Sequence, residues 1–141
     1  MKLHIIVLFT LLLSLAGCSK EPGEGGRNEI SGIVTAQNYN NSPQGIPIGD
    51  RYPMPEHRVY IIYGDGTYHD DDVRTGPDGR FRFSGLRKGT YTIYTISQKR
   101  RELPDQSGFY PVTRMVEITE KKGSIDIGEL PIERWRGYTE N

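Results

Sequence analysis

The chain has 141 residues, and its 18 Lys and Arg side chains balance 18 Asp and Glu side chains, so its formal net charge is zero. This balance argues against nucleic acid as a partner, because phosphate binding depends on clustered excess cations. The single cysteine excludes disulfides and Cys-rich zinc sites, so a folded domain here depends on its hydrophobic core.

The N-terminal segment has the three-part anatomy of a secretory signal. Lys2 gives a positive start, Ile5–Ala16 is a mainly apolar run, and small residues precede Cys18. The ending Leu15-Ala16-Gly17-Cys18 resembles the lipobox of bacterial lipoproteins, which implies removal of residues 1–17 and lipidation of Cys18. A transmembrane anchor is the alternative, but spanning hydrocarbon needs about 20 apolar residues and this run is shorter.

Residues 18–28 are rich in Gly and Glu, which predicts a flexible tether behind the lipidated cysteine. The acyl chains implied by the resemblance suffice for stable membrane anchoring. Acidic residues behind the cysteine are similar to the surface-export signal of some Gram-negative lipoproteins, and an ordinary polar linker is the alternative. We therefore expect an outer-membrane lipoprotein of the cell envelope, and its exposure at the surface stays open.

The rest of the chain alternates apolar and polar residues in short segments bounded by Gly, Pro, Asn and Asp. This period of two, without a sustained helical period, predicts an all-β sandwich over residues 29–134 and a tail at 135–141. Alternation does not fix the order of the strands. Seven strands are expected, at about residues 29–36, 59–63, 67–75, 80–84, 90–97, 112–118 and 125–132.

Residues 75–93 resemble the signature hairpin of carboxypeptidase regulatory-like domains, and Gly32-Ile33-Val34 and Val59-Tyr60-Ile61 are similar to the opening strands of that family. The resemblance covers about residues 29–132. It implies a seven-stranded transthyretin-like or prealbumin-like sandwich, an architecture that Cna protein B-type repeats share. The motif implies architecture and carries no chemistry, because it consists of turn residues and three core residues, Phe81, Phe83 and Leu86.

Two activities of related folds find little support. Cna protein B-type domains often form an isopeptide bond from a first-strand lysine to a last-strand Asn or Asp. Here Asp126 lies in the last strand, but residues 29–36 hold no lysine. Hydroxyisourate hydrolase ends in Tyr-Arg-Gly-Ser, which Trp135-Arg136-Gly137-Tyr138 matches weakly, and its early-strand histidine has no counterpart. We expect neither reaction.

The segment His69-Asp70-Asp71-Asp72 is the strongest candidate for a metal site, with Asp65 nearby in sequence. Adjacent strand residues point to opposite faces, so three consecutive aspartates cannot all face one ion unless the strand bulges. The alternating pattern of a calcium loop is also missing. A charged edge strand that resists aggregation is the preferred interpretation. We therefore expect no metal and no cofactor.

The connection at residues 38–56 is the predicted recognition element. Most plain connections have about 4–6 residues, and ones beyond about 12–15, as here, tend to be functional or disordered. Its four prolines restrict φ and lower the entropy lost on ordering. The alternative is a decoration in which Ile46 and Ile48 form a short extra strand. The candidate partner-binding residues are Tyr39, Pro43, Tyr52 and Pro53.

The sequence contains no motif for nucleophilic or metal-dependent hydrolysis. Glycosidase chemistry needs only two carboxylates at a suitable separation, so the lack of a motif does not exclude it. We therefore expect a lipid-anchored, non-catalytic module with a binding or accessory role. A small cell-surface hydrolase or a carbohydrate-active accessory protein is the alternative. The expected contacts are the membrane through Cys18 and an envelope protein, peptide or glycan, with no nucleic acid.

Overall fold

The computed structural model describes residues 21–40, 42–99 and 108–136, which form eight strands and no helix. The signal segment and Cys18 lie outside these residues, as does the tail beyond Arg136. Across the described part of the chain, no helix is long and apolar enough to cross a membrane. The strands are β1 (Glu24–Tyr39), β2 (Pro47–Pro53), β3 (Arg58–Tyr63), β4 (Asp71–Arg74), β5 (Arg80–Leu86), β6 (Gly89–Gln98), β7 (Phe109–Ile118) and β8 (Lys122–Trp135).

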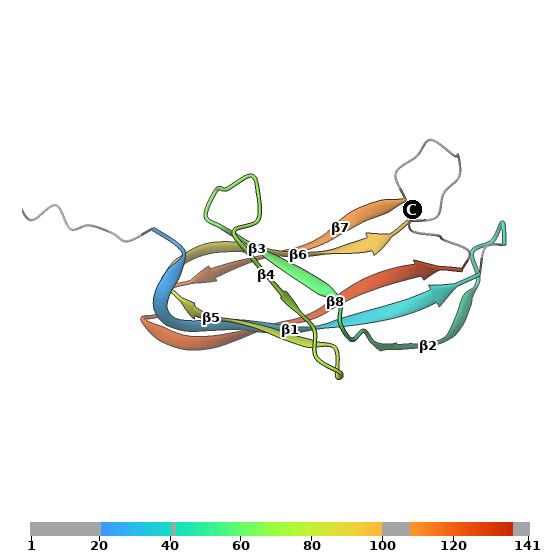
Figure 1. Ribbon diagram of the computed structural model, residues 1–141, viewed down its shortest axis with the longest axis horizontal. Coiled ribbons are helices and arrows are strands. Elements are labelled where there is room, and N and C mark those ends of the chain that lie inside the picture. Colours follow the sequence, from blue (N-terminus) through green and yellow to red (C-terminus); the bar gives the residue numbers. More distant parts are fainter. Residues whose placement is uncertain (1–20, 41, 100–107, 137–141) are drawn as a thin grey trace, which may run out of the picture.

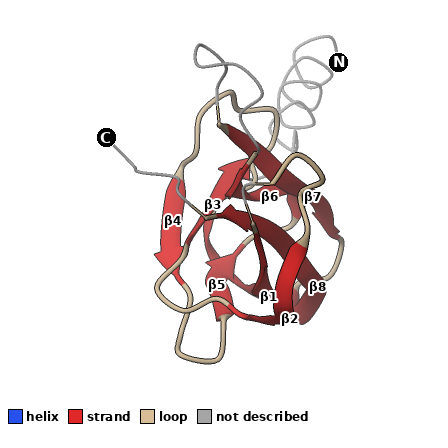
Figure 2. Ribbon diagram, turned by 90° about the vertical axis from the view of Figure 1, so that its right-hand side faces the viewer, coloured by secondary structure: helices blue, strands red, loops and turns tan. Residues whose placement is uncertain are grey.

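The strands form two four-stranded sheets. In the first sheet, β1 pairs in parallel with β8 along most of its length, and it pairs antiparallel with β5 and then with β2. The second sheet has the order β4-β3-β6-β7, and all its pairs are antiparallel. Figure 1 shows β1 and β8 side by side along the length of the molecule, and Figure 2 shows the layered arrangement of the strands from one end.

One hydrophobic core joins the two sheets. Alternate residues of β1 and β5 point into it, as do alternate residues of β3 and β6, because successive side chains of a strand face opposite sides of the sheet. Burial of these side chains supplies the main driving force for folding. The buried apolar residues are Ile30, Val34, Ala36, Val59, Ile61, Phe81, Phe83, Leu86, Tyr91, Ile93, Val116, Ile118, Leu130 and Ile132.

The predicted hairpin folds as its residues require. Gly79 N donates to Gly76 O at 2.9 Å and closes a turn, and Gly79 has a φ of 74°. A Cβ atom at Gly79 would lie 2.7 Å from the carbonyl oxygen of Val34, so only glycine fits there. The three predicted core residues of the motif, Phe81, Phe83 and Leu86, are all buried.

The strands differ from the expected set in number and in several bounds. The strand expected at 67–75 is reduced to β4, because the chain returns to β3 only at Asp70, whose N–H donates to Ile61 O at 2.8 Å, and the strand expected at 112–118 already begins at Phe109. There are eight rather than seven, because residues 47–53 of the predicted recognition loop form β2 and pair with β1. Strand β1 begins at Glu24, so the end of the expected tether belongs to the sheet, where Asn28 is buried and donates to Leu86 O at 3.1 Å. Strand β8 includes Trp135, which was expected in the tail. Strand β2 contains Ile48 of the alternative extra strand, whereas Ile46 lies just before it. Sequence patterns missed the extensions of β1 and β8 because cross-strand pairing, rather than local alternation, orders them.

Candidate functional site

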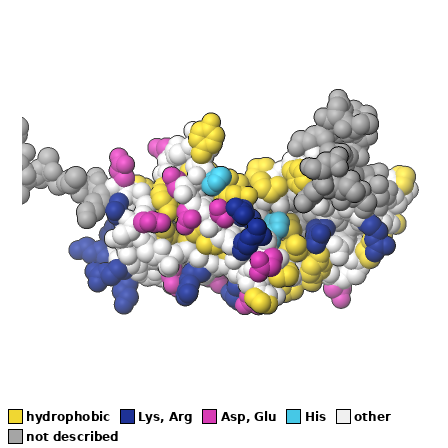
Figure 3. All heavy atoms as spheres, viewed as in Figure 1, with side chains coloured by type: hydrophobic (Ala, Val, Ile, Leu, Met, Phe, Trp, Pro, Cys, Tyr) yellow, Lys and Arg dark blue, Asp and Glu magenta, His cyan; other side chains and the backbone are white. Residues whose placement is uncertain are grey.

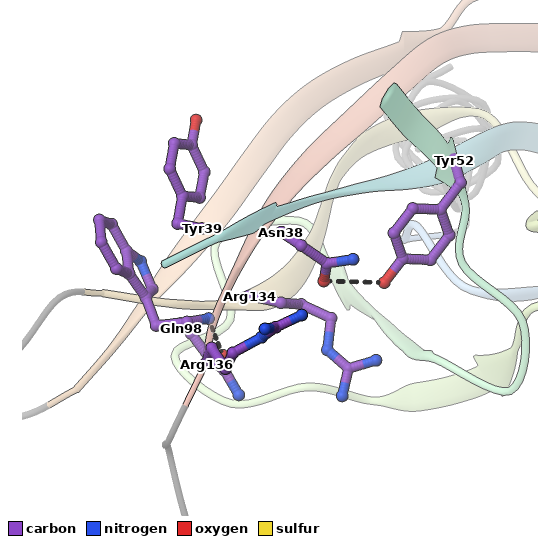
Figure 4. A pocket seen from close by; sticks show the side chains of 7 residues that line it. Asn38, Tyr39, Tyr52, Gln98, Arg134 and Arg136 are labelled. Carbon is purple, nitrogen blue, oxygen red and sulfur yellow. Dashed lines mark hydrogen bonds between the residues drawn. The ribbon is translucent and has the colours of Figure 1, made fainter. Parts of the chain in front are cut away.

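A pocket of about 390 Å³ opens at one end of the molecule, where β1, β2, β6 and β8 meet. We call it the end pocket, and Figure 4 shows its side chains. Its lining residues are Asn38, Tyr39, Tyr52, Gln98, Arg134, Trp135 and Arg136. The pocket therefore combines two cations, two amides and three aromatic residues.

Two arginines reach the end pocket because of the alternation along β8. Leu130 and Ile132 are buried and face the core. Arg134 and Arg136 have the same parity, so they continue this row beyond the edge of the core. Arg136 keeps this register past the end of β8, because its N–H donates to Tyr39 O at 3.0 Å.

The parallel pairing of β1 with β8 assembles the rest of the pocket. Asn38 is the register partner of Arg134, and Tyr39 is the register partner of Trp135. Tyr52 comes from β2, where it pairs with Ala36 of β1. Residues that are almost 100 positions apart in the sequence therefore form one site.

The oxygens of the two amides that line the end pocket each accept a hydrogen bond from within the protein. Asn38 Oδ1 accepts a hydrogen bond from Tyr52 Oη at 3.2 Å, and Gln98 Oε1 accepts one from the backbone N–H of Trp135 at 2.6 Å. These bonds orient both amides, so their NH₂ groups remain as donors. Together with the guanidinium groups, they make a donor-rich site that suits an acceptor-rich, anionic group.

The cations of the end pocket form no ion pair with a carboxylate of the described residues. Four ion pairs occur among the described residues, and none of them includes Arg134 or Arg136. Arg134 instead has its Nη1 atom 3.9 Å from the sulfur of Met54. In Figure 4, the side chains of Arg134 and Arg136 extend toward the side of the pocket where Tyr52 lies.

An aromatic pair holds β1 and β8 together beside the cations. The rings of Tyr39 and Trp135 are stacked, with centroids 4.8 Å apart and planes 17° from parallel. Trp135 Nε1 donates to Glu133 Oε2 at 3.1 Å. A Cβ atom at Gly45 would lie 2.8 Å from the Trp135 ring, so the loop before β2 packs closely against it.

A second, more apolar pocket of about 160 Å³ adjoins the end pocket and shares Gln98 and Arg134 with it. We call it the side pocket. It is also lined by Met54, His57, Ile96, Phe109, Ile132 and Glu133. Phe109 is 40% exposed, so part of this apolar surface faces solvent.

The predicted recognition residues divide into two groups. Tyr39 and Tyr52 line the end pocket, and Pro43 and Pro53 are not among its lining residues. Asn38 lies in the predicted recognition element 38–56 but was not among its candidate residues. Sequence reasoning missed Gln98 and Arg134, and it placed Trp135 and Arg136 in a C-terminal tail. The available signal was that Arg134 and Arg136 continue the parity of Leu130 and Ile132.

Another hollow, of about 520 Å³, lies over β1 and β5 and is a weaker candidate. All three of its arginines are already engaged: Arg82 pairs with Glu29 of the lining and Arg80 pairs with Asp126 outside it, both at 3.8 Å, and Arg74 Nη1 donates to Glu56 O at 2.9 Å. It is therefore less suited to bind a charged ligand than the end pocket.

The acidic segment at the start of β4 contributes bonds that hold the fold. Asp70 Oδ2 accepts a hydrogen bond from the backbone N–H of Tyr63 at 2.7 Å, and Asp72 pairs with Arg58 at 3.2 Å. Within the described ranges, no group of three His, Cys, Asp or Glu residues is placed to hold a metal ion. Figure 3 shows acidic side chains gathered around the connection from β3 to β4, in agreement with the predicted charged edge.

Comparisons with known proteins identify no family. No family model matches the chain, and no curated protein matches it. Among solved structures, it is similar to the crystal structure of "a putative carbohydrate binding protein (PA1324)" from Pseudomonas aeruginosa, with 14% identity and a TM-score of 0.44. The match covers 79% of this chain and 91% of that chain. The function is therefore argued from the residues of the end pocket.

Proposed function

We propose that this protein is a non-catalytic binding module of the cell envelope, and that it binds an anionic group of its ligand in the end pocket. The observation that carries this proposal is the position of Arg134 and Arg136 on one face of β8, in a pocket whose amides also present donors. The lipobox resemblance supports attachment to the outer membrane through lipid on Cys18.

The two guanidinium groups are suited to an anion. Residues two positions apart on a strand are roughly 7 Å apart along its axis, so their like charges repel, and an anion between them relieves this repulsion. Arginine also presents a planar fork of donors that matches the geometry of a carboxylate or phosphate. A carboxylate, sulfate or phosphate group on the ligand therefore fits the site.

The composition of the end pocket favours binding over hydrolysis. Among the residues that the structure describes, its lining contains no His, Asp, Glu, Lys, Ser, Thr or Cys, which are the usual general bases and nucleophiles. The hydroxyl group of Tyr52 already donates to Asn38. This supports a non-catalytic role over the alternative of a small hydrolase.

We also propose that the domain is a carboxypeptidase regulatory-like sandwich with an added strand. Support comes from the hairpin at residues 75–93, in which Phe81, Phe83 and Leu86 are buried as the resemblance implies. In this interpretation β2 is the addition to the seven-stranded framework, and it delivers Tyr52 to the end pocket.

Trp135 offers a direct test, because it is the only tryptophan of the chain and it lines the end pocket. The full chain in detergent is titrated with acetate, sulfate and phosphate at constant ionic strength while the fluorescence of Trp135 is measured. We expect a saturable change that is lost in the double variant Arg134→Gln/Arg136→Gln. Arg114→Gln, an exposed arginine on β7, is the matched control and should respond as the wild type does.

An identical response of all three proteins would overturn the proposed function, because the signal would then be independent of the two cations. The thermal melt of each variant, followed by circular dichroism, checks that the fold is retained. Because Arg134 is exposed and forms no ion pair among the described residues, its replacement is expected to leave the melt unchanged.

A further inference from the structure

We propose that the ligand is a peptide or protein C-terminus that ends in an apolar residue. This inference rests on the proposed function and names the ligand class of the same site. Its carboxylate would bind Arg134 and Arg136 in the end pocket, and its last side chain would enter the side pocket.

The arrangement of the two pockets supports this assignment. They share Arg134 and Gln98, so a cationic subsite and an apolar subsite adjoin without a gap. Ile132 lies two residues before Arg134 on the same face of β8, which places the apolar wall roughly 7 Å along the strand from the cation. In the last residue of a peptide, the carboxylate and the side chain are attached to the same Cα atom. One residue can therefore reach both subsites.

The side pocket discriminates between ligand classes. Its apolar lining includes Met54, Phe109 and Ile132. The ring carbons of an acidic sugar carry hydroxyl groups, and burial of a hydroxyl group without a partner is unfavourable. The polar lining residues His57, Gln98 and Glu133 already form hydrogen bonds within the protein, so a glycan hydroxyl group in the side pocket would compete with these bonds. An apolar C-terminal residue packs against the apolar lining while its carboxylate satisfies the arginines.

The donors of the end pocket match a free carboxylate rather than an internal peptide bond. A carboxylate has two oxygens and about four acceptor sites, whereas a peptide carbonyl has one oxygen and no net charge. The guanidinium groups and the NH₂ groups of Asn38 and Gln98 supply several donors for these sites. Capture of a terminal carboxylate is a known mode of peptide recognition.

The test measures fluorescence anisotropy of short labelled peptides with the full chain in detergent. Three peptides differ at the C-terminus: leucine with a free carboxylate, leucine with an amide, and serine with a free carboxylate. We expect the leucine acid to bind at least about tenfold more tightly than the leucine amide, because amidation removes the charge-assisted hydrogen bonds. We expect it to bind about tenfold more tightly than the serine acid, because serine buries less apolar surface.

Variants test whether the preference for the acid over the amide depends on the end pocket, and whether the preference for leucine over serine depends on the side pocket. Arg134→Gln and Arg136→Gln should each remove most of the difference between the leucine acid and its amide, and Arg114→Gln should leave it unchanged. Met54→Ser should reduce the preference for leucine over serine while the preference for the acid persists, because Met54 lines only the side pocket.

The outcomes separate the inference from the proposed function. If an oligogalacturonate binds in an arginine-dependent way and the leucine acid does not, the anion-binding function stands and the peptide inference is wrong. Equal affinities of the leucine acid and its amide would overturn the inference as well. If Arg134→Gln and Arg136→Gln change no response to any anion, including those of the fluorescence titration, both proposals fail.

Discussion

Tyr39 and Trp135 are register partners in the parallel pair of β1 and β8, and their rings stack with centroids 4.8 Å apart. This contact joins the ends of two strands at the rim of the end pocket. Past it, the backbone N–H of Arg136 still bonds to Tyr39 O. The stack therefore helps to fix the position of the arginines on either side of Trp135.

The stack predicts a measurable coupling between these two residues. In a double-mutant cycle of Tyr39→Leu and Trp135→Leu, we expect a coupling free energy of about 0.5–1.5 kcal/mol, the range for aromatic pairs. Denaturant unfolding followed by circular dichroism gives the four free energies. A cycle of Tyr39→Leu with Tyr60→Leu, whose ring stacks on Tyr94 in the other sheet, should show no coupling. Zero coupling between Tyr39 and Trp135 would contradict a stabilising stack.

Phe83 is 3% exposed, so its place in the core predicts a large loss of stability when its side chain is truncated. Phe83→Ala should lower the free energy of unfolding by about 3–5 kcal/mol, because it removes buried apolar surface and leaves a cavity. The next residue, Ser84, is exposed on the other face of β5, so Ser84→Ala is the matched control and should change stability by less than about 0.5 kcal/mol. Equal losses in the free energy of unfolding would contradict the assignment of Phe83 to the buried face of β5 and of Ser84 to the exposed face.

Gly79 and Gly85 have the same φ but different surroundings, so their alanine variants distinguish the cost of backbone strain from the cost of a steric clash. Gly79 and Gly85 both have a φ of 74°, but a Cβ atom at Gly79 would lie 2.7 Å from Val34 O, whereas one at Gly85 meets nothing within 4 Å. Gly85→Ala should cost about 1–2 kcal/mol for the left-handed conformation. Gly79→Ala should cost clearly more, as measured by denaturant unfolding. The reverse order would show that the turn at Gly79 can move away from β1.

The raised pKa of Tyr63 predicts that the protein loses stability in strong alkali. Desolvation by burial, with a contribution from the carboxylate of Glu24, raises the pKa of Tyr63 from 10 to about 12. Because the folded pKa lies above the unfolded one, this contribution to stability is complete below pH of about 10 and is lost as the pH rises through about 12. The free energy of unfolding should therefore fall more steeply over this window in the wild type than in Tyr63→Phe. An equal pH dependence of the free energy of unfolding in the two proteins would contradict the raised pKa of Tyr63.

Lipid attachment is tested by replacement of Cys18. In Cys18→Ser cells we expect uncleaved precursor and loss of the domain from the outer-membrane fraction, because the acyl chains supply the anchor. Metabolic labelling with palmitate and fractionation of the envelope provide the measurements. A Cys18→Ser protein that is still labelled and still sediments with the outer membrane would refute the assignment.

Local sequence determined the all-β class and most core positions. Phe81 and Phe83 alternate with charged residues, and both are buried because a strand of this pattern has one apolar face. Tyr94 and Ile96 gave the 90–97 segment a second apolar face, which predicts a central strand, and β6 lies between β3 and β7. These features depend on side-chain period and turn chemistry, which are properties of short segments.

The sequence pointed to Tyr39 and Tyr52, but tertiary structure decided which residues join them in the site. Asn38 and Tyr39 meet Arg134 and Trp135 only because β1 and β8 pair in parallel, and alternation within a strand does not specify its partner or direction. The same pairing extended β8 through Trp135 and turned Arg134 and Arg136 toward one end of the core. The sequence determined which faces are apolar, whereas long-range backbone hydrogen bonds determined which polar side chains share a pocket.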